Sequence, residues 1–89
     1  MKHLSIKVHG RVQGVFYRAE AGEKATELGL FGFAKNAPDR TVTLEAEGPE
    51  PVLEKFLDWC RQGPRMAHVE KVEYLYTDDL KNFTNFSIQ

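Results

Sequence analysis

The stretch from Gly10 to Arg18, GRVQGVFYR, combines residue types that can hold a small anion. Gly10 and Gly14 allow main-chain angles that other residues avoid, so successive N–H groups can turn toward one point. Arg18 adds a planar guanidinium that suits phosphate or carboxylate oxygens. A helix beginning near Ala19 would bring its positive end to the same place. The pattern predicts an oxyanion-binding loop, although a glycine-bent turn with Arg18 on the surface explains the spacing equally well.

The loop lacks the reactive groups of two common phosphate-handling sites. A nucleotide-binding P-loop needs Gly-Lys-Ser/Thr, which is absent. A cysteine phosphatase needs a thiolate six residues before its arginine, where this chain has Val12. No side chain of the loop can therefore attack phosphorus covalently.

The three histidines and two acidic residues of a predicted strand are expected on the solvent-facing surface; they are His3, His9, His68, Glu45 and Glu47. His3 and His9 lie six residues apart on one predicted strand, a separation of roughly 20 Å, so they cannot share a ligand. The acidic residues form no metal-binding motif. We therefore expect no metal site.

Without a nucleophile, a metal or an evident general base, water would have to attack a substrate that already has a good leaving group. An acyl phosphate qualifies, because its leaving carboxylate has a conjugate acid with a pKa of about 4 and needs no general acid. Alkyl phosphates do not qualify. The residues thus restrict any phosphoryl chemistry here to activated phosphates.

Hydrophobic periodicity and turn residues predict five strands and two helices. The strands cover His3–His9, Leu30–Asn36, Thr41–Glu47, Val69–Tyr76 and Phe83–Ile88, and the helices cover Ala19–Leu28 and a segment from Val52 that stops at Gly63-Pro64. This order predicts an α+β, ferredoxin-like split β-α-β fold, with both helices on one face of an antiparallel sheet and a short extra C-terminal strand. Because strands of a β-α-β unit run parallel, the Gly10–Arg18 loop and Asn36 should meet at one edge of the sheet.

Length, composition and net charge limit the number of domains, the partners and the cellular location of the protein. A chain of 89 residues with 42% hydrophobic and 28% charged side chains suits a single domain covering residues 1–89. The net charge of −1 argues against nucleic acid as a partner, and no apolar run is long enough for a membrane helix. With one cysteine, Cys60, no internal disulfide can form. We expect a cytoplasmic protein with no membrane partner.

Two segments together resemble the motifs of the acylphosphatase family. They are VHGRVQGVFYR and, eighteen positions after its arginine, the asparagine of GFAKNAPDRTVTLEAEG. With both helices and the length, the resemblance spans nearly the whole chain. It implies hydrolysis of a small-molecule acyl phosphate to carboxylate and inorganic phosphate without metal or cofactor.

The resemblance also implies roles for individual residues. Arg18 would hold the phosphoryl group and offset its charge, and Asn36 would orient the attacking water. The loop N–H groups would contact the remaining phosphoryl oxygens; these residues are Gln13, Gly14, Val15, Phe16, Tyr17 and Arg18. The water proton could pass to a phosphoryl oxygen of the substrate. We expect the protein to act as a monomer.

Two positions depart from the family pattern. Tyr17 stands where Phe or Met is usual before the arginine, and it should be tolerated if its hydroxyl reaches solvent or a partner. Arg40 stands where the hairpin usually carries glycine. If that position needs a positive φ, Arg40 costs about 1 kcal/mol and could shift Asn36.

One alternative function stays open at this point. The same fold could bind a phosphorylated or carbamoylated ligand such as carbamoyl phosphate, or an RNA phosphate, without turnover. A strand face that binds RNA would carry exposed aromatic and basic residues. The first strand instead exposes Ser5, Lys7 and histidines, which gives this alternative weak support.

Overall fold

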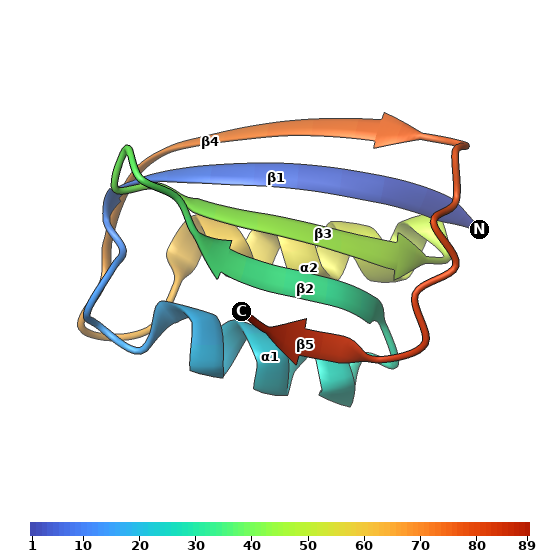
Figure 1. Cartoon of the computed structure of the whole chain (residues 1–89), viewed down its shortest axis with the longest axis horizontal. Coiled ribbons are helices and arrows are strands. Elements are labelled where there is room, and N and C mark those ends of the chain that lie inside the picture. The colour runs from blue at the N-terminus through green and yellow to red at the C-terminus, as the bar shows by residue number, and fades with distance from the viewer.

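Two helices alternate with five strands along the chain, and the computed structural model describes all residues from 1 to 89. In chain order the elements are β1 (Lys2–Arg11), α1 (Tyr17–Glu27), β2 (Phe31–Asn36), β3 (Val42–Gly48), α2 (Glu50–Gln62), β4 (His68–Thr77) and β5 (Phe86–Ile88) (Figure 1). This is the ferredoxin-like order that the sequence predicts.

The strands form one sheet in the order β4-β1-β3-β2-β5. β1 pairs antiparallel with β3 and β4, and β2 pairs antiparallel with β3. The predicted antiparallel sheet is confirmed for β1 to β4, and the predicted extra strand, β5, pairs parallel with β2, so the complete sheet is mixed. After β4 the chain passes along one end of the sheet and enters β5 in the direction of β2 (Figure 1).

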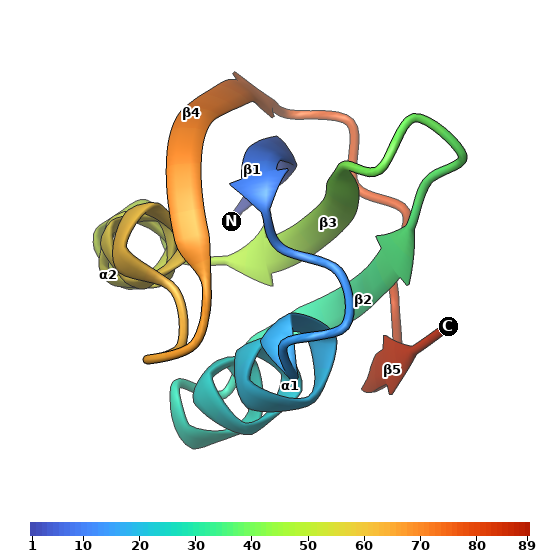
Figure 2. The ribbon, with the colours of Figure 1, turned by 90° about the vertical axis from the view of Figure 1, so that its left-hand side faces the viewer.

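Both helices cover the same face of the sheet, as Figure 2 shows in the view along the strands. α1 packs closely because, beyond Tyr17 at its start, its buried positions are small: Ala21, Gly22 and Ala25. A Cβ at Gly22 would lie 2.6 Å from Ile88 Cδ1, so the glycine lets β5 approach the helix. α2 instead buries larger side chains, namely Leu53, Phe56, Leu57 and Cys60. Neither helix is long and apolar enough to cross a membrane.

The topology brings two distant segments to one end of the sheet, as predicted. β1 and β2 are both antiparallel to β3, so they run in the same direction and end on the same side. The loop that follows β1 therefore lies beside Asn36, the last residue of β2. The β2–β3 and α2–β4 connections also lie at this end (Figure 1).

At the opposite end of the sheet, the prediction that His3 and Glu47 are exposed to solvent is wrong. Both residues are buried, and His3 Nδ1 lies 2.6 Å from Glu47 Oε2. The other ring nitrogen of His3 lies 3.1 Å from Glu45 Oε1. Glu47 also accepts hydrogen bonds from the main-chain N–H groups of Lys81 at 2.6 Å and Asn82 at 3.0 Å. The β4–β5 connection covers this end of the face, so His3 and Glu47, which alternate outward, are still buried.

Most element boundaries differ from the predictions by one to three residues, and two of these differences have a clear local basis. α1 begins at Tyr17, before the predicted Ala19, because Phe16 already ends the loop in the left-handed conformation. The last strand begins at Phe86 and not at Phe83. Phe83 lies outside the strand and packs against His3 and Phe33, with ring centroids 6.1 and 5.9 Å apart.

Candidate active site

Two glycines of the Gly10–Arg18 segment have a positive φ, one near the end of β1 and one in the loop between β1 and α1, each for a different reason. At Gly10, with φ +126°, a Cβ would lie 2.2 Å from the His68 carbonyl oxygen, where the register between β1 and β4 shifts. Only glycine fits this bulge, which bends β1 as it leaves the sheet. At Gly14, with φ +75°, a Cβ would meet no atom within 4 Å, so the backbone angle alone favours glycine there.

The start of α1 is anchored by Tyr17, which is buried beneath the loop. Its hydroxyl donates a hydrogen bond to the Cys60 carbonyl of α2 at 2.7 Å, so the extra hydroxyl at this position has a partner. Burial raises the pKa of Tyr17 well above its usual range, which keeps the phenol neutral. No side chain caps the first turn of the helix. Its free N–H groups therefore remain available at the cleft.

Arg18 lies in this first turn and is half-buried. Its guanidinium donates from Nη1 to the main-chain oxygen of Gln89. Gln89 is itself held by a 2.8 Å hydrogen bond from its N–H to the Ala34 carbonyl of β2. The segment after β5 thus steadies Arg18 through the parallel pairing that sequence reasoning missed.

Asn36 and Arg18 both line a small cleft of about 270 Å³. Its lining residues are Val12, Gly14, Phe16, Tyr17, Arg18, Ala19, Asn36 and Ile88. Arg18 is the one charged side chain among them. Asn36 Oδ1 is buried and has no hydrogen-bond partner in the protein. A buried acceptor without a partner is costly, so its presence in a cleft indicates a ligand or water as its partner.

Gln13 ties the loop to the hairpin that follows Asn36. Its side-chain Nε2 donates to the Ala37 carbonyl and to the Thr41 carbonyl, both at 2.9 Å. These two residues close the β2–β3 turn, where the Ala37 N–H also donates to the Thr41 carbonyl at 2.9 Å. The amide of Gln13 therefore fixes the spacing between the loop and β2.

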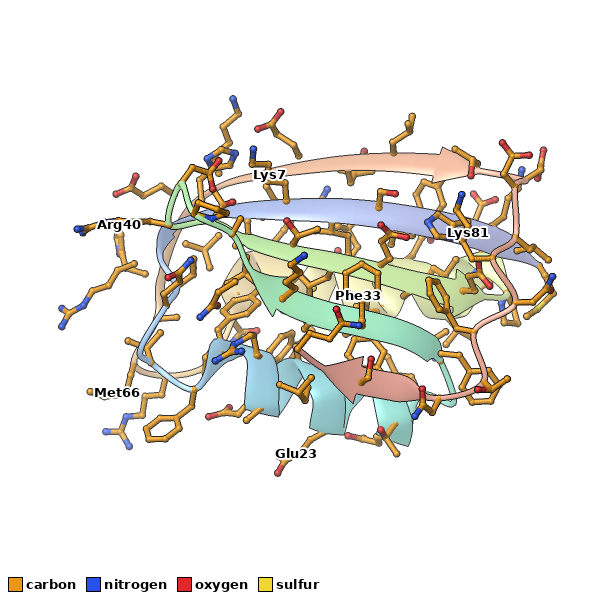
Figure 3. All side chains as sticks on the ribbon, viewed as in Figure 1. Lys7, Glu23, Phe33, Arg40, Met66 and Lys81 are labelled. Atoms are coloured by element: carbon orange, nitrogen blue, oxygen red, sulfur yellow. The ribbon has the colours of Figure 1, made fainter.

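The β2–β3 turn contains Arg40 at φ +72°, which confirms that this position needs a positive φ. Its N–H donates to the Ala37 carbonyl at 3.1 Å. Asp39 stabilises the same turn by accepting from the Thr41 N–H and hydroxyl, and it pairs with Lys7 at 3.0 Å. The Thr41 hydroxyl, followed by Lys7, holds the pKa of Asp39 far below its usual range. Figure 3 shows Arg40 projecting outward at the end of the molecule, and it is not among the lining residues of the cleft.

Most of the predicted site residues meet in the cleft. Five of them line it: Gly14, Phe16, Tyr17, Arg18 and Asn36. Val15 and Gln13 do not, because Val15 is buried in the core and the Gln13 side chain turns to the hairpin. The sequence analysis did not identify three other lining residues, Val12, Ala19 and Ile88. The residues around Gln13 gave no sign that its side chain would hydrogen-bond to the β2–β3 hairpin.

Fold and cleft together define a class: an α+β domain with one small site at the end of its sheet. The site offers a guanidinium, a helix N-terminus and a free amide oxygen, and its other lining side chains are mostly apolar. Such a set can hold a small oxyanion and orient one water molecule.

Comparisons with known proteins give the family. The family profile described as Acylphosphatase matches residues 4–88. A curated acylphosphatase of Thermus thermophilus is 53% identical over 85 residues, covering 93% of this chain and 97% of its own. One from Methylococcus capsulatus is 44% identical over 88 residues, covering 99% and 96%. The crystal structure of acylphosphatase from Bacillus subtilis superposes with a TM-score of 0.97 at 34% identity, covering 100% of this chain and 99% of its own.

The chain belongs to the acylphosphatase family. It is a hydrolase that acts on acyl phosphates. The expected enzyme class and the expected ferredoxin-like fold are both confirmed.

Proposed function

We propose that Arg18 and Asn36 carry out the hydrolysis of a small-molecule acyl phosphate in the cleft between α1 and β2. The observation that carries this proposal is the buried Asn36 Oδ1, which has no partner in the protein and shares the cleft with Arg18. A folding role for Asn36 would require its oxygen to be bonded within the protein. A water molecule about to react would supply the missing donor.

Arg18 binds the phosphoryl group as a charged, planar donor. The free N–H groups at the start of α1 and those of the loop from Gln13 onward contact the other phosphoryl oxygens. Such donors act most strongly where negative charge grows during transfer, in a site that partly excludes water. Binding and charge stabilisation thus come from fixed groups of the fold.

Asn36 orients the water that attacks phosphorus. A bond forms between the water oxygen and phosphorus, and the bond from phosphorus to the acyl oxygen breaks, with its electron pair leaving on the carboxylate. One water proton passes to a phosphoryl oxygen, so the products are a carboxylate and inorganic phosphate. No general acid is needed because the leaving carboxylate is a weak base.

The donor set of the cleft supports a reaction without a resident metal. The lining has no carboxylate, imidazole or thiol, and no group of three or more such side chains in the chain is placed to hold an ion. Hard cations such as Mg²⁺ prefer carboxylate oxygens. The proposed chemistry therefore needs only the substrate, water and the residues named above.

The proposal extends to the setting of the enzyme. The free thiol of Cys60 is buried, and burial raises its pKa to about 12, so it stays protonated and unreactive. We place the enzyme in the cytoplasm as a single-domain monomer; gel filtration with light scattering tests the monomer.

The test is hydrolysis of benzoyl phosphate in a chelator-containing buffer. We expect the natural protein to be active, and Arg18→Ala and Asn36→Ala each to lower kcat by roughly 10²–10³-fold. Arg65→Ala and Asn85→Ala are matched controls at exposed positions outside the cleft and should keep full activity. Activity that depends on added metal, or that survives both cleft substitutions, would overturn the proposal.

A further inference from the structure

Two nearby positions of the loop have the same unusual backbone conformation but very different side chains. Gly14 has φ +75° and Phe16 has φ +65°. Glycine adopts this conformation freely, whereas a bulky side chain does so at a cost. The chain thus carries a phenylalanine where the backbone alone would favour glycine or asparagine.

The ring of Phe16 has no role in folding that would explain its presence. The side chain is 73% exposed, the most exposed phenylalanine of the chain, and it belongs neither to the core cluster nor to its partly buried neighbours. It takes part in none of the aromatic pairs. An exposed aromatic ring on a strained backbone is unfavourable twice over, and such features concentrate at functional sites.

Phe16 also lies in the wall of the cleft, two residues before Arg18. Apart from Arg18 and Asn36, the lining side chains are apolar or have their polar group turned away, as Tyr17 does toward Cys60. No lining residue is acidic, and none offers a second cation for a charged acyl group. Beyond the phosphoryl-binding groups, the wall therefore suits an uncharged, apolar surface.

We propose that the Phe16 side chain is the contact for the acyl group of the substrate and selects aromatic or bulky apolar acyl phosphates over small ones. The inference rests on the proposed function, because it needs the phosphoryl group held by Arg18. The acyl group is bonded to that phosphoryl group, so it must leave the cleft past the adjacent wall. An aromatic side chain has only two rotatable bonds, so contact with the acyl group there costs little conformational freedom.

The experiment compares two substrates in each variant. The measured quantity is the ratio of kcat/KM for benzoyl phosphate to that for acetyl phosphate. Phe16→Asn removes the ring but tolerates the left-handed backbone, and Phe16→Gly removes the ring and the strain together. We expect both to lower the ratio by roughly five- to tenfold through a higher KM for benzoyl phosphate. Phe16→Tyr keeps the ring and should keep the ratio within about twofold.

A matched control is Met66→Asn. Met66 is another exposed apolar residue at the same end of the molecule, seen in Figure 3, but it does not line the cleft. Its substitution should leave the ratio unchanged. Urea unfolding of each variant checks that all are folded under assay conditions.

The outcomes separate this inference from the proposed function. Phe16→Asn and Phe16→Gly could lower kcat/KM equally for benzoyl and acetyl phosphate, or leave it unchanged for both, so that the ratio keeps its natural value. In that case the ring does not contact the acyl group, and the inference fails while the enzyme assignment stands. If Phe16→Tyr loses the preference as fully as Phe16→Asn, the inference also fails. If the natural protein hydrolyses neither substrate, the proposed function itself fails and the inference with it.

Discussion

β1 runs between two groups of polar residues that differ in their hydrogen bonding within the protein. At its start, each ring nitrogen of His3 faces a carboxylate, and Glu47 accepts two further main-chain hydrogen bonds. At its end lies the cleft, where Asn36 Oδ1 has no partner and Arg18 makes one bond, to a main-chain oxygen. Figure 3 shows the two ends through Lys81 on one side and Arg40 on the other.

The difference separates polar groups that hold the fold from those left free for a substrate. A buried polar group stabilises the protein only when its partners are inside the protein. A group whose partner is missing weakens the fold slightly and can bind something else. Substitution of the bonded groups at the first end should therefore change mainly stability, and substitution of the unpartnered Asn36 at the second end should change mainly activity.

The largest effect is expected from Asn36→Leu, which replaces the unpartnered amide by an apolar group of similar size. We expect kcat for benzoyl phosphate to fall by roughly 10²-fold or more. The free energy of unfolding should stay the same or rise by up to about 1 kcal/mol, because a buried oxygen without a partner is removed. Urea unfolding and steady-state kinetics measure the two quantities. A loss of stability equal to the loss of activity would break the comparison.

The converse experiment is Glu47→Gln at the other end of β1. Removing the charge opposite buried His3 should lower the free energy of unfolding by about 3 kcal/mol. The kcat of the folded protein should remain within about twofold of the natural value. Glu54→Gln, on the exposed side of α2, is the matched control and should change stability by less than about 0.5 kcal/mol.

The stability gap between the natural protein and Glu47→Gln should depend on pH. Burial acts to raise the pKa of Glu47, but hydrogen bonds from the Lys81 N–H, from His3 and from the Asn82 N–H outweigh it and hold the pKa below its usual value. The stabilisation is therefore complete above the unfolded-state pKa of about 4.3 and is lost as pH falls through the lower folded-state pKa. Urea unfolding from pH 7 downward should show the gap narrowing only in this acidic range; a gap independent of pH would contradict the assignment.

Gln13→Met should give an effect of intermediate size on both quantities, because Gln13 links the loop to the hairpin beside Asn36. Loss of its two hydrogen bonds should lower kcat by roughly tenfold and the free energy of unfolding by about 1–2 kcal/mol. The control is Gln62→Met, the same substitution at an exposed position at the end of α2. It removes no such hydrogen bonds and should change neither kcat nor the free energy of unfolding. An unchanged kcat for Gln13→Met would show that the hydrogen bonds from Gln13 to the hairpin do not position the cleft residues.

The smallest effect is expected from Arg40→Gly. It relieves the left-handed backbone and should raise the free energy of unfolding by about 0.5–1 kcal/mol. Arg40→Ala removes the charge but keeps the strain, so it should not stabilise the protein. Urea unfolding distinguishes the two variants, and equal stability in both would mean that the backbone at this turn is not strained.

The pattern of residues predicted the local features well. Alternating Leu4, Ile6 and Val8 predicted a strand with one buried face, and all three are buried in β1. The loop and Asn36 were placed at one edge from the β-α-β topology alone, and both line the cleft. Arg40 stands where the family pattern usually has glycine, and it adopts the positive φ considered for this position.

Features that depend on distant segments could not be found in the same way. Glu47 occupies an outward position of β3, and its burial comes from Lys81 and Asn82, more than thirty residues later in the chain. The parallel pairing of β5 and the contact from Gln89 to Arg18 depend on where the chain returns after β4. Two-residue periodicity reports which face a residue takes, but not what later covers that face.

The sequence by itself determined the order of elements and the glycine loop with its arginine, because these follow from local backbone preferences, residue chemistry and short-range periodicity. The role expected of Asn36 came from the resemblance to a known family. Only the tertiary structure decided which polar atoms would find partners. Hydrogen bonding between residues far apart in sequence satisfied Glu47 at one end of β1 and left Asn36 Oδ1 free at the other. A polar group becomes part of the fold or remains open to a ligand according to what the rest of the chain brings within hydrogen-bond distance.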